Sequence, residues 1–163
     1  MKTLLILRHA KSSWENASQS DHDRPLNKRG KRTAPLVGGL IRDEKIVPDL
    51  ILSSTARRAR ETAFLVGENC GYTRAVELRA ELYPTSVERC LTVLRQVDDE
   101  NDCLLVVGHN PGLEEVVERL TLRFERLPTA ALVQLSLDLE DWPDLSKSTS
   151  ATLVNLWRPR EIF

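Results

Sequence analysis

The chain has 163 residues, with 23 lysines and arginines against 24 aspartates and glutamates, so its formal net charge is −1. This length favours one domain, residues 1–163, with a substantial core. The balanced charge argues against nucleic acid or an acidic membrane as the partner, and no apolar run has transmembrane length. The apolar run Leu4–Leu7 is too short for a signal peptide. Three cysteines without metal-ligand spacing are typical of reduced thiols, so we expect a cytoplasmic protein.

Strand and helix patterns alternate along the chain, which predicts an α/β fold with helices on the faces of a sheet. A polar stretch at 10–25 shows no periodicity and is long enough to suggest a functional loop. The strands are expected at about 3–8, 49–53, 75–78, 103–107, 130–139 and 152–157. The helices are expected at 27–43, 55–69, 86–97 and from Pro111 onward.

Some individual side chains also have expected places. Asn27 is expected to cap the helix that runs to Asp43, and Pro35 within that helix predicts a kink or a break. The inner side of the helix is expected to carry Leu36, Val37, Leu40 and Ile41. Core or edge packing is expected for the aromatic residues Trp142, Trp157 and Phe163.

Two apolar strands end in histidine. Leu4–Leu7 is followed by Arg8 and His9, and Cys103–Val107 is followed by Gly108 and His109. Ligands of open α/β sheets bind at the carboxyl ends of strands, so parallel neighbouring strands would bring the two imidazoles together. The alternative is that each histidine is an incidental polar residue at a strand end. The third histidine, His22, lies among polar residues and is expected to be solvated.

A third strand leads through a small polar turn into a helix that opens with arginines. Ser54 or Thr55 is a plausible N-cap. A helix N-terminus favours an anion, and arginine offers a planar fork of donors suited to phosphate. Because Arg57, Arg58 and Arg60 point in different directions, at most one or two can face a pocket. We expect Arg57 and Arg60 to be solvated.

These blocks, in this order, resemble the histidine phosphatase superfamily, whose fold is phosphoglycerate-mutase-like. A longer match is similar to its small phosphohistidine phosphatase branch, the SixA family. The resemblance implies a three-layer α/β/α sandwich around a mostly parallel sheet. It departs from the common motifs at Ala10, where glycine is usual, and at Thr55, where proline is common. The matching segments are 8–14, 23–27, 29–30, 54–59 and 108–111.

The resemblance also implies a mechanism. His9 would be the nucleophile and would form a transient phosphohistidine that water hydrolyses. Arg8, Arg58 and His109 would hold the phosphoryl oxygens. His109 would serve this best when protonated, whereas nearby cations should help keep His9 neutral. No cofactor or metal is needed, and the chain shows no P-loop.

The general acid is less defined. Superfamily esterases place a carboxylate after the third strand, where Glu81 is the nearest candidate. Asp23 is a second candidate, or it could brace Arg8 or Arg24. Lys11 and Arg24 are candidates to bind substrate, or they line the rim of the pocket.

The leaving group bears on the choice of substrate. A departing imidazole has a conjugate-acid pKa of about 6.5, whereas an alkoxide resembles hydroxide, for which water has a pKa of about 15.7. A P–N bond therefore needs less help from an acid. The stretch from Leu82 to Cys103 has room for one helix and not for a capping subdomain, so we expect an uncovered pocket, unless another segment such as 11–24 covers it.

We therefore expect a phosphatase that acts on protein phosphohistidine. The alternatives are a phosphomonoesterase for small metabolites, a mutase, a non-catalytic phosphate-binding module, and a binuclear metal phosphoesterase using histidines and aspartates.

Overall fold

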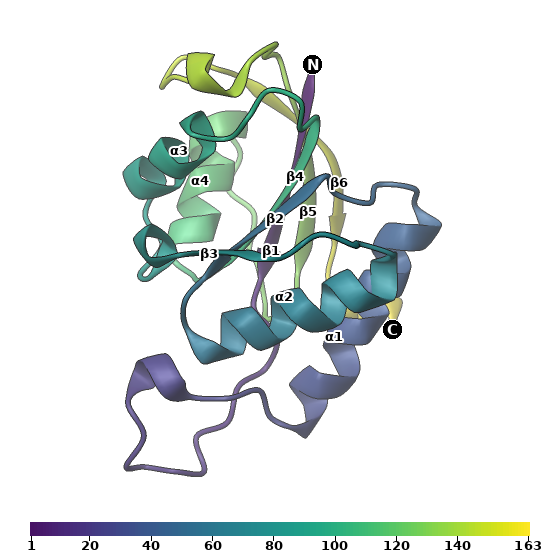
Figure 1. The fold of residues 1–163 in the computed structure, drawn as a ribbon, viewed down its shortest axis with the longest axis vertical. Coiled ribbons are helices and arrows are strands. Elements are labelled where there is room, and N and C mark those ends of the chain that lie inside the picture. Colours follow the sequence, from purple (N-terminus) through teal and green to yellow (C-terminus); the bar gives the residue numbers. More distant parts are fainter.

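Six strands form one sheet in the order β3-β2-β4-β1-β5-β6 in the computed structural model, which describes residues 1–163 (Figure 1). The parallel pairs are β3 with β2, β2 with β4, and β4 with β1, while β5 is antiparallel to both β1 and β6. The expected mostly parallel sheet is confirmed. The strands are β1 (Lys2–Arg8), β2 (Leu50–Ser54), β3 (Glu77–Arg79), β4 (Cys103–Gly108), β5 (Leu132–Leu137) and β6 (Ala151–Trp157).

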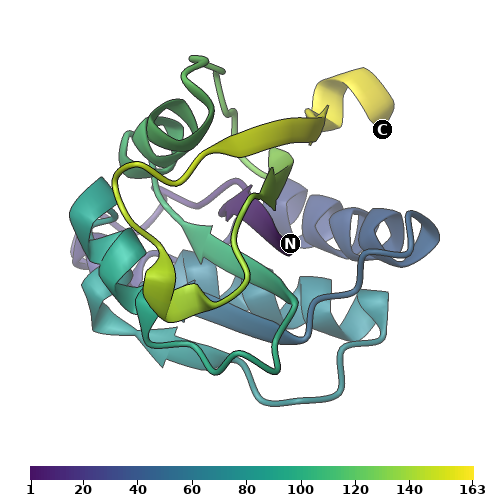
Figure 2. The same cartoon turned by 90° about the horizontal axis from the view of Figure 1, so that it is seen from above.

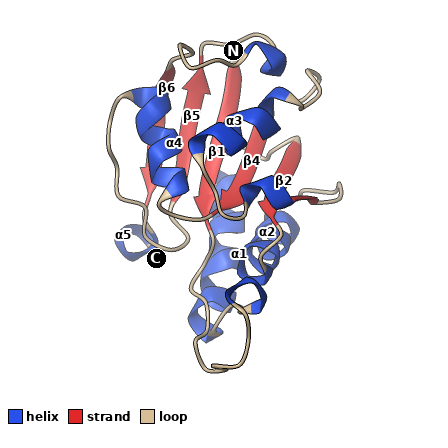
Figure 3. Cartoon of the chain, turned by 90° about the vertical axis from the view of Figure 1, so that its left-hand side faces the viewer, coloured by secondary structure: helices blue, strands red, loops and turns tan.

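Helices cover both faces of this sheet (Figures 2 and 3). One face carries α1 (Lys28–Asp43) and α2 (Arg57–Cys70), and the other carries α3 (Val87–Arg95) and α4 (Gly112–Thr121). A one-turn helix, α5 (Pro159–Ile162), follows β6. The three-layer arrangement agrees with the expectation from the sequence. No helix has both the length and the apolar character needed to cross a membrane.

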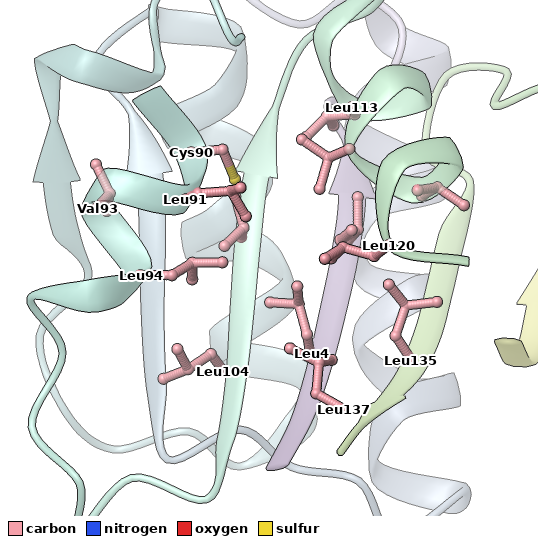
Figure 4. Close-up of a cluster of buried hydrophobic side chains, with 14 of the residues drawn as sticks. Leu4, Cys90, Leu91, Val93, Leu94, Leu104, Leu113, Leu120, Leu135 and Leu137 are labelled. Atoms are coloured by element: carbon pink, nitrogen blue, oxygen red, sulfur yellow. The ribbon is translucent and has the colours of Figure 1, made fainter. Parts of the chain in front are cut away.

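The core lies in two clusters, one on each face of the sheet. In β1, Leu4 and Ile6 belong to the cluster under α3 and α4, whereas Leu5 and Leu7 belong to the one under α1 and α2. Side chains of a strand alternate between faces, so a strand buried on both faces must be apolar throughout. Figure 4 shows the first cluster, in which Leu4 lies among leucines of α4 and β5. This burial fixes the strand ends at which the polar residues begin.

Helix α1 differs from expectation in two respects. It continues through Pro35 without a break, because the carbonyl that loses its partner belongs to Lys31, four residues earlier, and Lys31 is exposed to water. Leu36 is 49% exposed, since each residue turns about 100° around the helix and the buried face is centred on Val37 and Ile41. The expected cap is confirmed, because the Asn27 side chain accepts a hydrogen bond from the N–H of Gly30.

Three further expectations need correction or adjustment. The N-cap of α2 is Ala56, without a side-chain cap, because β2 continues through Ser54 and the Ser54 hydroxyl is used elsewhere. Phe163, the residue after α5, is half exposed, whereas Trp142 is buried and Trp157 packs against the core as expected. The third strand begins at Glu77 and not at Ala75.

Candidate active site

The two strand-end histidines meet. In the register of β1 and β4, Arg8 pairs with Gly108, so the next residues, His9 and His109, leave the sheet side by side. Their ring centroids are 5.1 Å apart, and each residue is only 7% exposed. The expected convergence of the two imidazoles is therefore confirmed.

The backbone holds His9 in one orientation. Its N–H donates to the carbonyl of Gly108, and its Nδ1 lies 2.7 Å from the carbonyl oxygen of Ala10. Because a carbonyl can only accept, Nδ1 carries the proton and Nε2 keeps a lone pair. Burial lowers the pKa of His9 to about 3, with smaller contributions from the charges of His109, Arg58 and Arg8. The expected neutral ring is present, although desolvation rather than the nearby cations is its main cause.

His109 differs from expectation in its charge. Burial lowers its pKa to about 4, with Arg58 adding to the effect, so this ring is neutral at pH 7 and not protonated. The backbone N–H of His109 donates to Thr85 Oγ1, and the ring Nε2 of His109 lies 2.7 Å from Ser54 Oγ. The Ser54 oxygen also accepts from the N–H of Ala56, which leaves its own proton for Nε2. His109 Nδ1 then carries a proton and is a neutral donor.

Two arginines flank the histidines. Arg58 is 6% exposed, and it donates through Nη1 to the carbonyl of Asp21 and through Nη2 to Asp21 Oδ2. Arg8 donates through Nη1 to the carbonyl of Leu127. The neighbours of Arg58 point elsewhere, as expected: Arg57 is exposed and pairs with Glu61, and Arg60 is partly exposed.

These side chains line a cavity of about 320 Å³. Three buried side-chain nitrogen or oxygen atoms in the structure have no hydrogen-bond partner, and all three belong to this cavity: Arg8 Nε, His109 Nδ1 and Asn110 Oδ1. Burying unpaired polar atoms is costly, so an arrangement of this kind is typical of a binding site. The lining residues are Arg8, His9, Lys11, Ser12, Trp14, Asp21, Arg24, Arg58, His109, Asn110 and Thr129.

A larger cavity, of about 450 Å³, lies at the opposite end of the strands around Asp49 and Arg74. It contains no histidine, and the Arg74 guanidinium is already bonded to the Asp49 carbonyl and the Asn101 side chain. The chemistry therefore points to the smaller cavity at the carboxyl ends of β1 and β4.

Known proteins are similar to this chain in sequence and in fold. The profile of the histidine phosphatase superfamily (branch 1) matches residues 4–83. The structure of SixA from Agrobacterium tumefaciens is 28% identical, with a TM-score of 0.80 over 97% of this chain and 99% of the other. SixA from Nakamurella multipartitia is 29% identical, with a TM-score of 0.83 over 97% and 96%. An uncharacterised protein of Mycobacterium tuberculosis is 32% identical over 94% of this chain and 100% of its own.

The chain belongs to the histidine phosphatase superfamily. Its fold and length place it in the SixA-type group, and it is a phosphatase that works through a histidine. The structure contains no group of three or more histidine, cysteine or acidic side chains that could hold a metal ion.

Asp21 is the functional candidate that sequence reasoning missed in this histidine phosphatase. It accepts hydrogen bonds from Tyr83, Arg58 and Arg24. The hydrogen bond from Tyr83, together with the two guanidinium groups, lowers the pKa of Asp21 to about 2. Asp21 is therefore an ionised brace for Arg58. No spacing in the polar stretch 10–25 distinguishes it from the neighbouring Asp23.

The two expected general acids lie elsewhere. Glu81 does not line the cavity, and it bonds to Arg79, which holds the pKa of that carboxyl below its usual range. A general acid needs the opposite shift. Asp23 is exposed, accepts from Ser20 and lies near His22, so it braces neither Arg8 nor Arg24. Both expectations are corrected: neither carboxylate is placed to protonate a leaving group.

His22 and Arg24 also have different surroundings from those expected. His22 is half-buried, with Nε2 at 3.0 Å from Thr55 Oγ1 and its ring against Tyr83, so it is not fully solvated. Arg24 lines the cavity, but its donors reach Ser13, Asp21 and Ser12, and its guanidinium stacks on the exposed ring of Trp14. Arg24 therefore mainly holds the loop together.

Residues 11–24 form one wall of the cavity. They contribute five of its lining residues, and Figure 1 shows this segment extending beyond the carboxyl ends of the strands. The expectation of an uncovered pocket is therefore corrected on this side. The stretch between Leu82 and Cys103 holds only α3, so no capping subdomain arises there.

The buried histidines give a prediction for the pH dependence. We expect the Cε1 protons of His9 and His109 to show no titration between pH 8 and about 5, because their pKa values are lowered to about 3 and about 4. The unfolded chain binds protons on these rings below about pH 6.5 and the folded chain does not, so the free energy of unfolding should fall as the pH falls from 6.5 toward 4. Proton NMR titration tests this, and a midpoint near 6.5 for either ring would contradict it.

Glu81 gives a second prediction. Because it lies outside the cavity and is paired with Arg79, Glu81→Gln removes no group that faces the substrate and should change kcat/KM by less than about twofold for both a phosphoester and a phosphohistidine substrate. Steady-state assays with p-nitrophenyl phosphate and a phosphohistidine peptide provide the measurement. A selective loss of ester hydrolysis would restore Glu81 as the acid.

Proposed function

We propose that this histidine phosphatase removes the phosphoryl group from phosphohistidine in proteins, through His9 and without a metal or cofactor. His9 Nε2 attacks phosphorus in line, forming a new P–N bond as the bond to the leaving group breaks. Water then attacks phosphorus, releasing phosphate and restoring the His9 lone pair. Residues 1–163 act as one catalytic domain in the cytoplasm, where the three free cysteines stay reduced.

The observation that carries the proposal is the set of unpaired buried atoms beside the His9 ring. Arg8 Nε and His109 Nδ1 are donors without partners, and Arg58 adds a buried positive charge. Phosphoryl transfer is catalysed chiefly by positioning and charge stabilisation. Arg8, Arg58 and His109 are therefore proposed to hold the phosphoryl oxygens, with Lys11 at the rim.

The proposed substrate class follows from the lack of a placed proton donor. Asp21, the carboxylate that lines the cavity, is held ionised with a pKa of about 2. An alkyl ester would have to lose an alkoxide, whereas phosphohistidine with a proton on its second ring nitrogen loses a neutral imidazole, whose conjugate acid has a pKa of about 6.5. A site without a protonated carboxyl is therefore better suited to a P–N bond.

Access to the cavity is consistent with a protein substrate. No inserted subdomain follows β3. The wall formed by residues 11–24 carries the exposed ring of Trp14. We infer that a phosphorylated side chain enters beside this wall, next to Asn110 and Thr129, which also line the cavity. A mutase must retain a bisphosphate intermediate, so a pocket without a capping subdomain favours a phosphatase over a mutase.

The decisive experiment compares substrates. We expect kcat/KM for a phosphohistidine peptide to exceed that for sugar phosphates by at least about 100-fold, with p-nitrophenyl phosphate in between because its leaving group is stabilised. A preference for sugar phosphates would instead favour a metabolite phosphomonoesterase. Phosphate binding without turnover of any of these substrates would favour a binding module.

A further inference from the structure

A second, smaller cavity adjoins the candidate active site. Its volume is about 130 Å³, and it shares Lys11 and Thr129 with the catalytic cavity. Arg29 reaches it from the first turn of α1, and Arg160 reaches it from α5. The remaining walls are Pro128 and Pro159. We call this space the cationic cavity.

The charges of the cationic cavity are not balanced by acidic groups. Lys11, Arg29 and Arg160 line it, and no aspartate or glutamate does. None of these three side chains forms an ion pair, and the nearby Glu161 is paired with Arg158. All three cations are exposed, so they are free to meet an incoming anion.

The N-terminal end of α1 adds to the positive electrostatic potential of the cationic cavity. Its first five residues include four cations, and its first turn has no acidic residue. The helix dipole places partial positive charge at this end as well. The net charge of the whole chain is −1, so this positive region is local and lies beside the mouth of the catalytic cavity. The four cations are Lys28, Arg29, Lys31 and Arg32.

We propose that the cationic cavity binds a carboxylate of the phosphorylated partner protein, next to the phosphohistidine that enters the catalytic cavity. This inference rests on the proposed function and adds a second recognition point to it. The shared Lys11 lies between the two anions. Charge pairs at such an exposed rim act mainly on association and specificity, so the effect should fall on KM and not on kcat.

The test uses two phosphohistidine peptides that differ only in their flanking residues, glutamates in one and glutamines in the other. We expect the wild-type protein to prefer the glutamate peptide. The double variant Arg29→Glu and Arg160→Glu should lower the ratio of the two kcat/KM values about tenfold or more at low salt, because charge complementarity raises association rates by about 10–1,000-fold. The matched control is Arg89→Glu, on an exposed turn of α3 on the other face of the sheet, which should leave this ratio unchanged.

Binding measured without turnover separates this inference from the proposed function. In fluorescence anisotropy, the unphosphorylated glutamate peptide should bind the wild-type protein more tightly than the double variant, even if no phosphohistidine is hydrolysed. Equal ratios in wild type and double variant, or equal losses in the Arg89→Glu control, would overturn the inference. Tighter binding of a small alkyl bisphosphate than of the glutamate peptide would also overturn it, in favour of a second phosphate subsite.

Discussion

His9→Ala should lower the turnover of phosphohistidine and of p-nitrophenyl phosphate by about 10⁴-fold or more, the scale seen when a covalent nucleophile is removed. The ring supplies the lone pair at Nε2, and no other side chain in the cavity offers a neutral, oriented nitrogen at this position, because His109 Nε2 is engaged with Ser54. Rapid quench followed by mass spectrometry should trap a phosphoryl group on His9 in the wild type and none in the variant.

The same variant should keep the fold and part of the phosphate affinity. Arg8, Arg58 and His109 remain in place, and the backbone hydrogen bond from residue 9 to Gly108 does not depend on the side chain. His22→Ala is the matched control, since His22 does not line the cavity, and it should keep most of the activity. Undiminished turnover in His9→Ala would rule out the covalent mechanism, and a phosphoryl group found on His109 would move the nucleophile to the other ring.

The sheet and the convergence of the histidines could be predicted because strand burial leaves a strong signal. Leu4–Leu7 and Leu104–Val107 are fully buried on both faces, so their composition is apolar throughout and the first polar residues mark the strand ends. The parallel register of β1 and β4 then determines which two side chains become neighbours. The signal is local in the sequence even though the contact is not.

The wall of the site could not be predicted in this way. Residues 11–24 have no periodicity, and their places depend on contacts with distant parts of the chain, such as Asp21 with Tyr83 and with Arg58. The charge of His109 was missed for a related reason, because burial is a property of the packed fold and outweighs the expectation that a phosphate site needs a protonated ring. Glu81 was assigned from its position along the chain, which carries no information about its partner Arg79.

Arg58→Ala should reduce kcat/KM for the phosphohistidine peptide by about 10³-fold, within the range for loss of one group that stabilises charge in the transition state. Arg58 is buried, so its charge acts in a medium where it is weakly screened. Its removal also leaves the ionised Asp21 facing the incoming phosphoryl group with Arg24 as its remaining counter-charge. Repulsion between these anions adds to the loss.

Arg57→Ala is the natural control for this variant. It removes the same side chain from the adjacent position, but Arg57 is exposed and paired with Glu61, so kcat/KM should stay within about twofold of wild type. Arg58→Lys should recover only part of the activity, because an ammonium group cannot replace the two directed hydrogen bonds to Asp21 while also facing phosphate. Asp21→Asn distinguishes bracing from direct catalysis. A loss of similar size for the ester and the phosphohistidine peptide, with the alkaline limb of the kcat profile unchanged, fits a brace that positions Arg58. Disappearance of an alkaline limb would make Asp21 a proton donor and reopen the choice of substrate.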